Sequence, residues 1–201
     1  MKRIALSFFL IAAAIACAET DNNNKQNKVT EQSPSADSTD AGNEKDSRTA
    51  LVKKARERMS LDNDIYSSDQ RREIEELYRS ISKNWQKEEG EKALNELLKK
   101  YKTANRTGCA ILYLGQMSEG KKREEYLNKA ITEYNDCAYG NGVQVGTYAR
   151  YLLGIYYLQN KQAKKAKKLF DEIKKQYPDS INHRGVPLVE LIEKQSSLRK
   201  K

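Results

Sequence analysis

The chain has 201 residues, a hydrophobic content of 38% and a formal net charge of +9. This length accommodates one modest domain, and the composition suits a soluble, highly charged helical protein rather than a membrane protein with several spans. The positive charge is uneven, because the stretch 18–49 carries more acidic than basic residues. The rest of the chain is therefore strongly basic, which suits nucleic acid, anionic lipid or another polyanion as a partner.

The N-terminus has the pattern of a signal peptide over residues 1–16. Lys2 and Arg3 precede an almost entirely apolar stretch, 4–16, which is too short to span a bilayer as a stable helix. The stretch ends in Ala-Ile-Ala before Cys17, which resembles the lipoprotein box of bacteria, although that box most often has leucine where Ala14 stands. The resemblance implies cleavage before Cys17 and lipidation of its thiol.

The alternative is ordinary cleavage after Ala18, which would remove Cys17 and release a soluble secreted protein. If Cys17 is lipidated, the absence of aspartate directly after it implies sorting to the outer rather than the inner membrane. The expected location is the bacterial cell envelope, with the domain facing the periplasm or the exterior. A location in the cell envelope argues against a nucleic-acid partner.

The segment 17–48 is rich in Asn, Gln, Ser, Thr and charged residues and has almost no apolar side chains. Such a segment cannot bury enough surface to offset its ordering entropy. We therefore expect a disordered tether that links the lipid anchor to a folded domain over 49–201. A spacer is the simpler interpretation, and a binding tail is the alternative.

The folded domain is predicted to be all-helical and built from repeats. Apolar residues recur at helical spacing from a first helix at about 49–60 onward. The clearest repeat, 147–180, carries Leu153, Gly154, Tyr157, Ala166, Phe170 and Pro178. This spacing resembles the tetratricopeptide repeat (TPR), apart from Arg150 where the family has tryptophan. The small residues Gly154 and Ala166 are expected where two antiparallel helices approach closely.

Two weaker repeats precede it, over about 74–107 and 108–146. The second is about five residues longer than the family pattern, with extra length predicted on both sides of its second helix. A final helix, about 187–199, is expected to cap the end of the stack. The resulting fold class is all-α, a stack of about three TPR-like helical hairpins with N-terminal and C-terminal flanking helices.

By resemblance, TPR-like repeats bind partners on the concave surface formed by their first helices. Carried onto this sequence, the groove residues are Tyr78, Trp85, Leu112, Gln116, Tyr148, Tyr151 and Ile155. Aromatic residues are common binding anchors. The alternative is that they pack between repeats or under the cap.

The sequence contains few residues arranged as a catalytic or metal site would require, so we predict no enzyme activity, no metal and no cofactor. His183 is the single histidine. The glycine-rich segment 140–146 lacks the spacing of a dinucleotide fingerprint and is expected to be an inter-repeat loop. A recognition role for this loop, near His183 and Arg184, is the alternative.

Two cysteines remain after Cys17. Cys109 is predicted near the start of one helix and Cys137 near the end of its antiparallel partner, so the two are expected to lie close together. An oxidising envelope permits a disulfide between them. Two small buried thiols are the alternative.

Together these patterns predict a membrane-tethered protein–protein interaction module, a scaffold or adaptor that holds a peptide or protein segment in its groove. The alternative is a structural lipoprotein whose basic face, including the lysines at 164, 165, 167 and 168, associates with anionic lipid or polysaccharide. The oligomeric state is not indicated.

Overall fold

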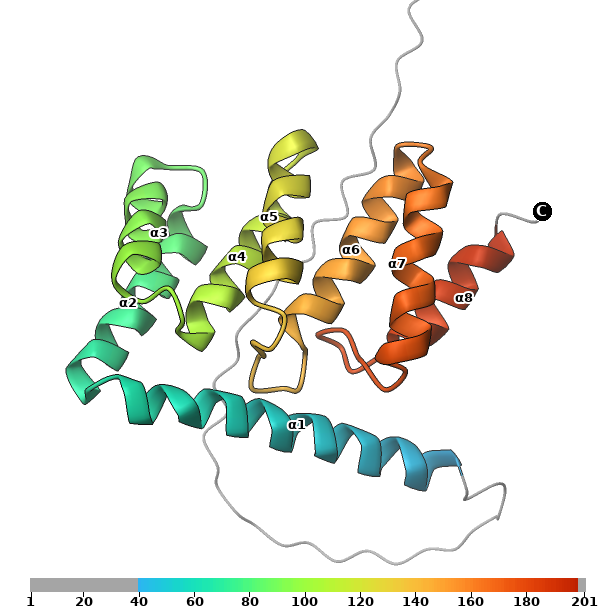
Figure 1. Cartoon of the computed structure of the whole chain (residues 1–201), viewed down its shortest axis with the longest axis horizontal. Helices are drawn as coiled ribbons and strands as arrows, with labels where there is room; N and C mark the ends of the chain where they lie inside the picture. The colour runs from blue at the N-terminus through green and yellow to red at the C-terminus, as the bar shows by residue number, and fades with distance from the viewer. Residues whose placement is uncertain (1–39, 199–201) are drawn as a thin grey trace, which may run out of the picture. The chain divides into compact units, whose positions relative to one another are not determined.

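The computed structural model describes residues 40–198, with side-chain surroundings over 46–195 (Figure 1). This part of the chain is all-α. Its helices are α1 (Asp40–Ile65), α2 (Ser68–Asn84), α3 (Glu88–Lys100), α4 (Asn105–Met117), α5 (Gly120–Glu133), α6 (Val145–Gln159), α7 (Ala163–Gln176) and α8 (Leu188–Leu198). The predicted signal peptide, Cys17 and the tether up to residue 39 lie outside the described residues.

Six of the helices form three antiparallel hairpins, α2–α3, α4–α5 and α6–α7, which follow one another in chain order (Figure 1). Neighbouring hairpins meet through α2, α4 and α6, and α5 also packs along α6. One continuous core runs through all three hairpins, with Ile81, Leu97, Ile111, Leu127 and Leu153 almost fully buried. The helix at the end, α8, packs on α7 in the position predicted for a cap.

Small residues set the distance between the two helices of a hairpin. A Cβ atom at Gly154 would lie 2.4 Å from the Phe170 ring, and one at Gly115 would lie 2.6 Å from the side chain of Leu127. Ala166 is fully buried. The predicted reason for Gly154 and Ala166 is therefore confirmed. The helix α7 ends at Gln176, directly before Tyr177 and Pro178, as the sequence predicted.

The first helix is much longer than the predicted span of about 49–60. It begins at Asp40, so the predicted tether boundary at residue 48 is wrong, and it ends at Ile65. The error has a physical cause. Only a narrow stripe of α1, including Leu51 and Ala55, packs against the rest of the domain, and its first turns carry no apolar periodicity. The following helix starts as expected, with Ser67 and Gln70 forming a capping box.

Two long loops, the first over 134–144 and the second over 177–187, have the same backbone structure. Each contains one isolated antiparallel bridge, Ala138 with Gln144 and Ile181 with Pro187. Five backbone hydrogen bonds, including those of the bridges, recur with an offset of 43 positions, as in Tyr139 N–H to the Val143 carbonyl and Asn182 N–H to the Val186 carbonyl. The extra length of the middle repeat therefore lies after its second helix alone, because only Ser118 and Glu119 separate α4 from α5.

A glycine with positive φ closes the turn in each long loop. Gly142 has φ 92° and Gly185 has φ 81°, a region that side chains with a Cβ rarely adopt. Both glycines face α1, since a Cβ at Gly142 would meet Leu51 at 3.1 Å and one at Gly185 would meet Arg48 at 3.2 Å. The helix α1 therefore lies along the side on which both loops emerge (Figure 1).

A small second core joins α1 to the two loops. Leu51 from α1, Val143 from the first loop and Ile181 from the second are all buried together. Tyr139 and Tyr148 pack against this cluster. The apolar contacts of this second core hold both loops beside the exposed side of α6. The side chains of the loops therefore lie there as well.

A buried polar junction fixes the first loop. The side-chain amide of Asn105 donates to the Ala138 carbonyl and accepts from the Ala138 N–H, both at 2.8 Å. Asp62 accepts a 2.9 Å hydrogen bond from the Asn105 N–H, which supplies the cap that Ala104 cannot give to α4. Arg58 extends from α1 to Asp136 at 2.8 Å and to the Thr103 carbonyl at 3.0 Å.

The Gly154→Ala variant tests the close approach of α6 and α7. We expect its free energy of unfolding to fall by about 2 kcal/mol, because the added methyl group overpacks against Phe170. Chemical denaturation followed by circular dichroism measures the change. Gly140→Ala is the matched control, since the nearest atom to its Cβ position is a Met59 sulfur at 3.9 Å. An equal loss in both variants would contradict the interpretation.

Candidate functional site

Three of the predicted groove residues and two loop residues form a continuous row of aromatic side chains, which we call the aromatic band: Tyr78, Tyr139, His183, Tyr148 and Tyr151. The His183 ring lies edge-on to Tyr139 at 4.7 Å and to Tyr148 at 5.1 Å between ring centroids. Tyr148 stacks parallel to Tyr151 at 6.1 Å. All five side chains are partly exposed. The band therefore presents ring surface to solvent while its members hold one another in place.

The band extends to α2 through Tyr78. The side chains of Tyr78 and Tyr139 interact, and the Tyr139 hydroxyl donates to the Cys109 carbonyl at 2.9 Å. The Arg106 guanidinium lies 4.8 Å from the centre of the Tyr78 ring and pairs with Glu75 at 2.7 Å. Side chains from α2, α4, α6 and both long loops thus meet on one surface.

Burial keeps the band uncharged near neutral pH. It raises the pKa of Tyr139 well above its ordinary value and lowers the pKa of His183. Burial also raises the pKa of Tyr148, and Gln116 and the positive charge of Arg184 act in the opposite direction. The surface therefore offers neutral rings, phenolic hydroxyls and an imidazole, with the exposed Arg184 beside them.

The structure brings together four of the seven predicted groove residues. Tyr78, Tyr148 and Tyr151 belong to the aromatic band, and Gln116 interacts with Tyr148. Ile155 is half-buried on α6, one turn beyond Tyr151.

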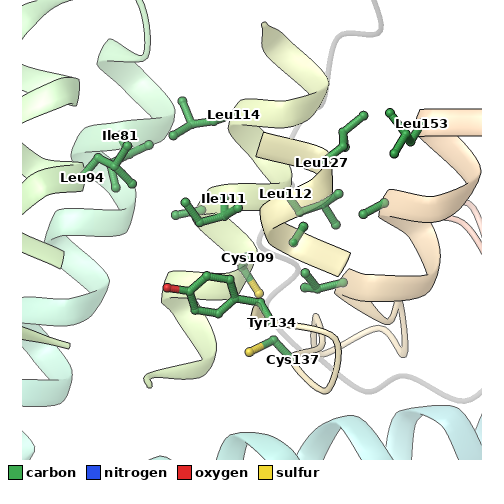
Figure 2. Close-up of a cluster of buried hydrophobic side chains, with 14 of the residues drawn as sticks. Ile81, Leu94, Cys109, Ile111, Leu112, Leu114, Leu127, Tyr134, Cys137 and Leu153 are labelled. Carbon is green, nitrogen blue, oxygen red and sulfur yellow. The ribbon is translucent and has the colours of Figure 1, made fainter. Parts of the chain in front are cut away.

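The other two predicted residues lie elsewhere. Leu112 is completely buried in the core between the hairpins (Figure 2), so its prediction as a partner-binding residue is wrong. The TPR-like spacing located the correct helix, but this position of α4 faces the core rather than an open surface. Trp85 caps the C-terminus of α2 at the hairpin tip and lines a separate cleft.

Sequence reasoning missed Tyr139 and gave His183 and Arg184 only as an alternative. A usable signal was present in the two long loops, whose sequences share Tyr-x-Asp at 134–136 and 177–179 and Gly-Val at 142–143 and 185–186. The repeated pattern would have predicted that both loops fold alike and bring residues 139 and 183 to one place. Residues 140–144 lie in the connection between two hairpins, as expected, whereas 145 and 146 belong to α6.

Arg150, which stands where the TPR pattern has tryptophan, has a structural role. Its guanidinium is almost buried, pairs with Glu172 at 2.7 Å and donates to the Asn135 side chain at 2.6 Å. It also lies 5.2 Å from the centre of the Tyr177 ring. A planar cation with several donors thus holds α6, α7 and the first long loop together.

Cys109 and Cys137 are both buried, free thiols, so the predicted disulfide is not formed in the structure. The two side chains lie near each other beside Tyr134 (Figure 2). Cys109 lies within the second turn of α4, and Cys137 follows the end of α5. Burial raises the pKa of each thiol to about 12. Neutral, shielded thiols react slowly.

The outer surface of α7 carries the predicted lysine run. The lysines at 164, 165, 167 and 168 are all exposed. Lys167 pairs with Asp171 at 2.6 Å, and Lys165 lies 4.9 Å from the Tyr157 ring centre. Within residues 46–195, no group of three or more His, Cys, Asp or Glu side chains has the arrangement of a metal site.

Comparisons of the chain with protein-family models, with curated proteins and with solved structures find no match. Among the described helices, none is long and apolar enough to cross a membrane.

The His183→Phe variant tests the buried imidazole. Because burial lowers the folded-state pKa of His183 below 6.5, its stabilising contribution is complete above pH 6.5 and is lost as the pH falls through the folded pKa. Phenylalanine keeps a ring between Tyr139 and Tyr148 but cannot titrate. We expect urea unfolding between about pH 7.5 and about pH 5 to show a smaller loss of stability in the variant. A parallel pH dependence in both proteins would exclude this role.

Thiol counting tests the state of the cysteines. The structure predicts that residues 49–201 contain two reactive thiols after denaturation without reductant and almost none while folded, because both side chains are buried. A chromogenic disulfide reagent measures both values. No reactive thiol without reductant would instead establish the disulfide predicted from the sequence.

Proposed function

We propose that the three hairpins are TPR-like repeats and that the chain is a membrane-tethered protein–protein interaction module of the bacterial cell envelope. A peptide or protein segment would bind on the aromatic band. The observation that carries this proposal is the continuity of the band, which connects α2, α4, α6 and both long loops across three hairpins.

The chemistry of the band supports binding rather than catalysis. Tyrosine rings bury large areas with few rotatable bonds, and their hydroxyls hydrogen-bond a peptide backbone. Mutual packing through His183 and the hydrogen bond from Tyr139 restrict the rings before a partner arrives. Because the rings are already held in place before binding, they lose less conformational entropy when a partner binds.

The membrane-tethered part of the proposal depends on the sequence. The segment 1–16 has signal-peptide character, and a lipidated Cys17 would anchor the chain, with sorting to the outer membrane favoured. Tethering would raise the effective concentration of the module near partners in the same membrane.

A pull-down from envelope extract with residues 19–201 tests the proposal. We expect a partner to be retained by the parent and lost from a Tyr148→Ala/Tyr151→Ala variant, since removal of two anchor rings weakens binding by tenfold or more. Tyr156→Ala is the control, because this half-buried tyrosine also lies on α6 but packs beside Tyr157, outside the band. Circular dichroism verifies that all three proteins are equally helical.

The exposed lysines of α7 support a second candidate, association with anionic lipid or polysaccharide. Binding of that kind weakens steeply with salt and is indifferent to the two tyrosines. If salt removes the bound partners but the tyrosine variant still retains them, the binding site is the α7 surface and not the aromatic band.

A further inference from the structure

A separate cleft of about 690 Å³ lies at the tips of the first two hairpins. It is formed by the turn between α2 and α3, the first half of α3, the end of α4 and the start of α5. The cleft exists because the hairpins join unequally: α5 packs along α6, whereas α3 has few contacts with α4. Its volume is within the usual range of ligand sites.

The cleft has an apolar floor and aromatic sides. Leu94 and Leu114 are almost completely buried, one on each side of the boundary between the hairpins (Figure 2). Trp85, Met117 and Tyr126 are half-exposed around them. The sequence-predicted anchor Trp85 is therefore part of this cleft and not of the aromatic band.

Two hydrogen-bonding groups on the sides have no protein partner. Within residues 46–195, neither the Trp85 indole N–H nor the Tyr126 hydroxyl makes a hydrogen bond, whereas Tyr101 and Tyr157 each donate to a carboxylate. Burial, followed by the charge of Glu91, raises the pKa of Tyr126, so its hydroxyl keeps its proton. The cleft thus offers two hydrogen-bond donors beside apolar surface.

The rim of the cleft carries both signs of charge. Lys87, Glu88 and Glu91 stand on the first hairpin, and Glu119 and Lys122 on the second. Glu88 pairs with Lys92 at 2.7 Å, and the other four, two lysines and two glutamates, make no ion pair within 46–195. The rim therefore selects neither an acidic nor a basic partner, and binding should depend little on salt.

We infer that this cleft binds an extended, polyproline II-like segment of a partner protein, with small apolar side chains against Trp85 and Tyr126 and backbone carbonyls accepting from both donors. An α-helical ligand fits less well because its carbonyls are already bonded internally. A β-strand would need a sheet edge, and the described residues contain only isolated bridges. A polyproline II segment has unpaired carbonyls and little conformational entropy to lose.

The test uses Trp85, the single tryptophan of the chain, as a reporter. The full-length chain is titrated with a pool of uncharged, end-blocked proline-rich peptides, followed by tryptophan emission and by the indole ¹H–¹⁵N signal. We expect saturable changes in both, without induced helicity in the bound peptide. No change from any peptide at millimolar concentration would overturn the inference, and so would a peptide that becomes helical on binding.

Variants locate the binding site. Tyr126→Phe keeps the ring and the Trp85 reporter but removes one donor, so affinity should fall about tenfold. Tyr156→Phe, remote from the cleft, should bind as the parent does. Tyr148→Ala/Tyr151→Ala should also bind as the parent does, because the cleft is independent of the aromatic band. Binding lost in that double variant but kept in Tyr126→Phe would assign the peptide to the band and refute the cleft.

Discussion

The two hydrogen bonds between the Asn105 side chain and the Ala138 backbone hold the centre of the molecule in place. Both lie in a fully buried position, where an unpaired amide or carbonyl costs about 1–3 kcal/mol. They attach the first long loop to the N-terminus of α4, and Asp62 attaches the same point to α1. The place of Tyr139, and through it the packing of His183, follows from this junction.

The binding surface consequently depends on loops as much as on helices. Helix–helix packing places Tyr78 on the first hairpin and Tyr148 and Tyr151 on the third, and the space between them is filled from the long loops. The positive-φ glycines let those loops turn tightly against α1, and Leu51 packs against both. Helix α1 contributes no side chain to the band, yet it supports the two loops that complete it.

The sequence predicted the third hairpin well, since Gly154 contacts Phe170 within a single pair of helices, Ala166 is buried on the second of them, and the spacing of these residues reports the pairing directly. It predicted α1 too short, because the turns before residue 49 carry no apolar periodicity and the buried residue near the end of the helix, Asp62, is polar. It also failed for Leu112, because this position of α4 faces the core between the hairpins. The aromatic band was predicted only in part, because its helical members follow the repeat pattern whereas Tyr139 and His183 lie in loops, whose folding helical periodicity does not describe.

The equivalence of the long loops has a consequence for how such a molecule can be lengthened. The unit that recurs with an offset of 43 is not a hairpin but a loop with the helices on either side of it, α5 to α6 and again α7 to α8. A duplicated 43-residue block spliced within α7 would bring its own glycine turn, its own bridge and a new surface for an extended first helix. The long loop between consecutive hairpins, rather than the hairpin itself, is thus the element that determines how the stack can be extended.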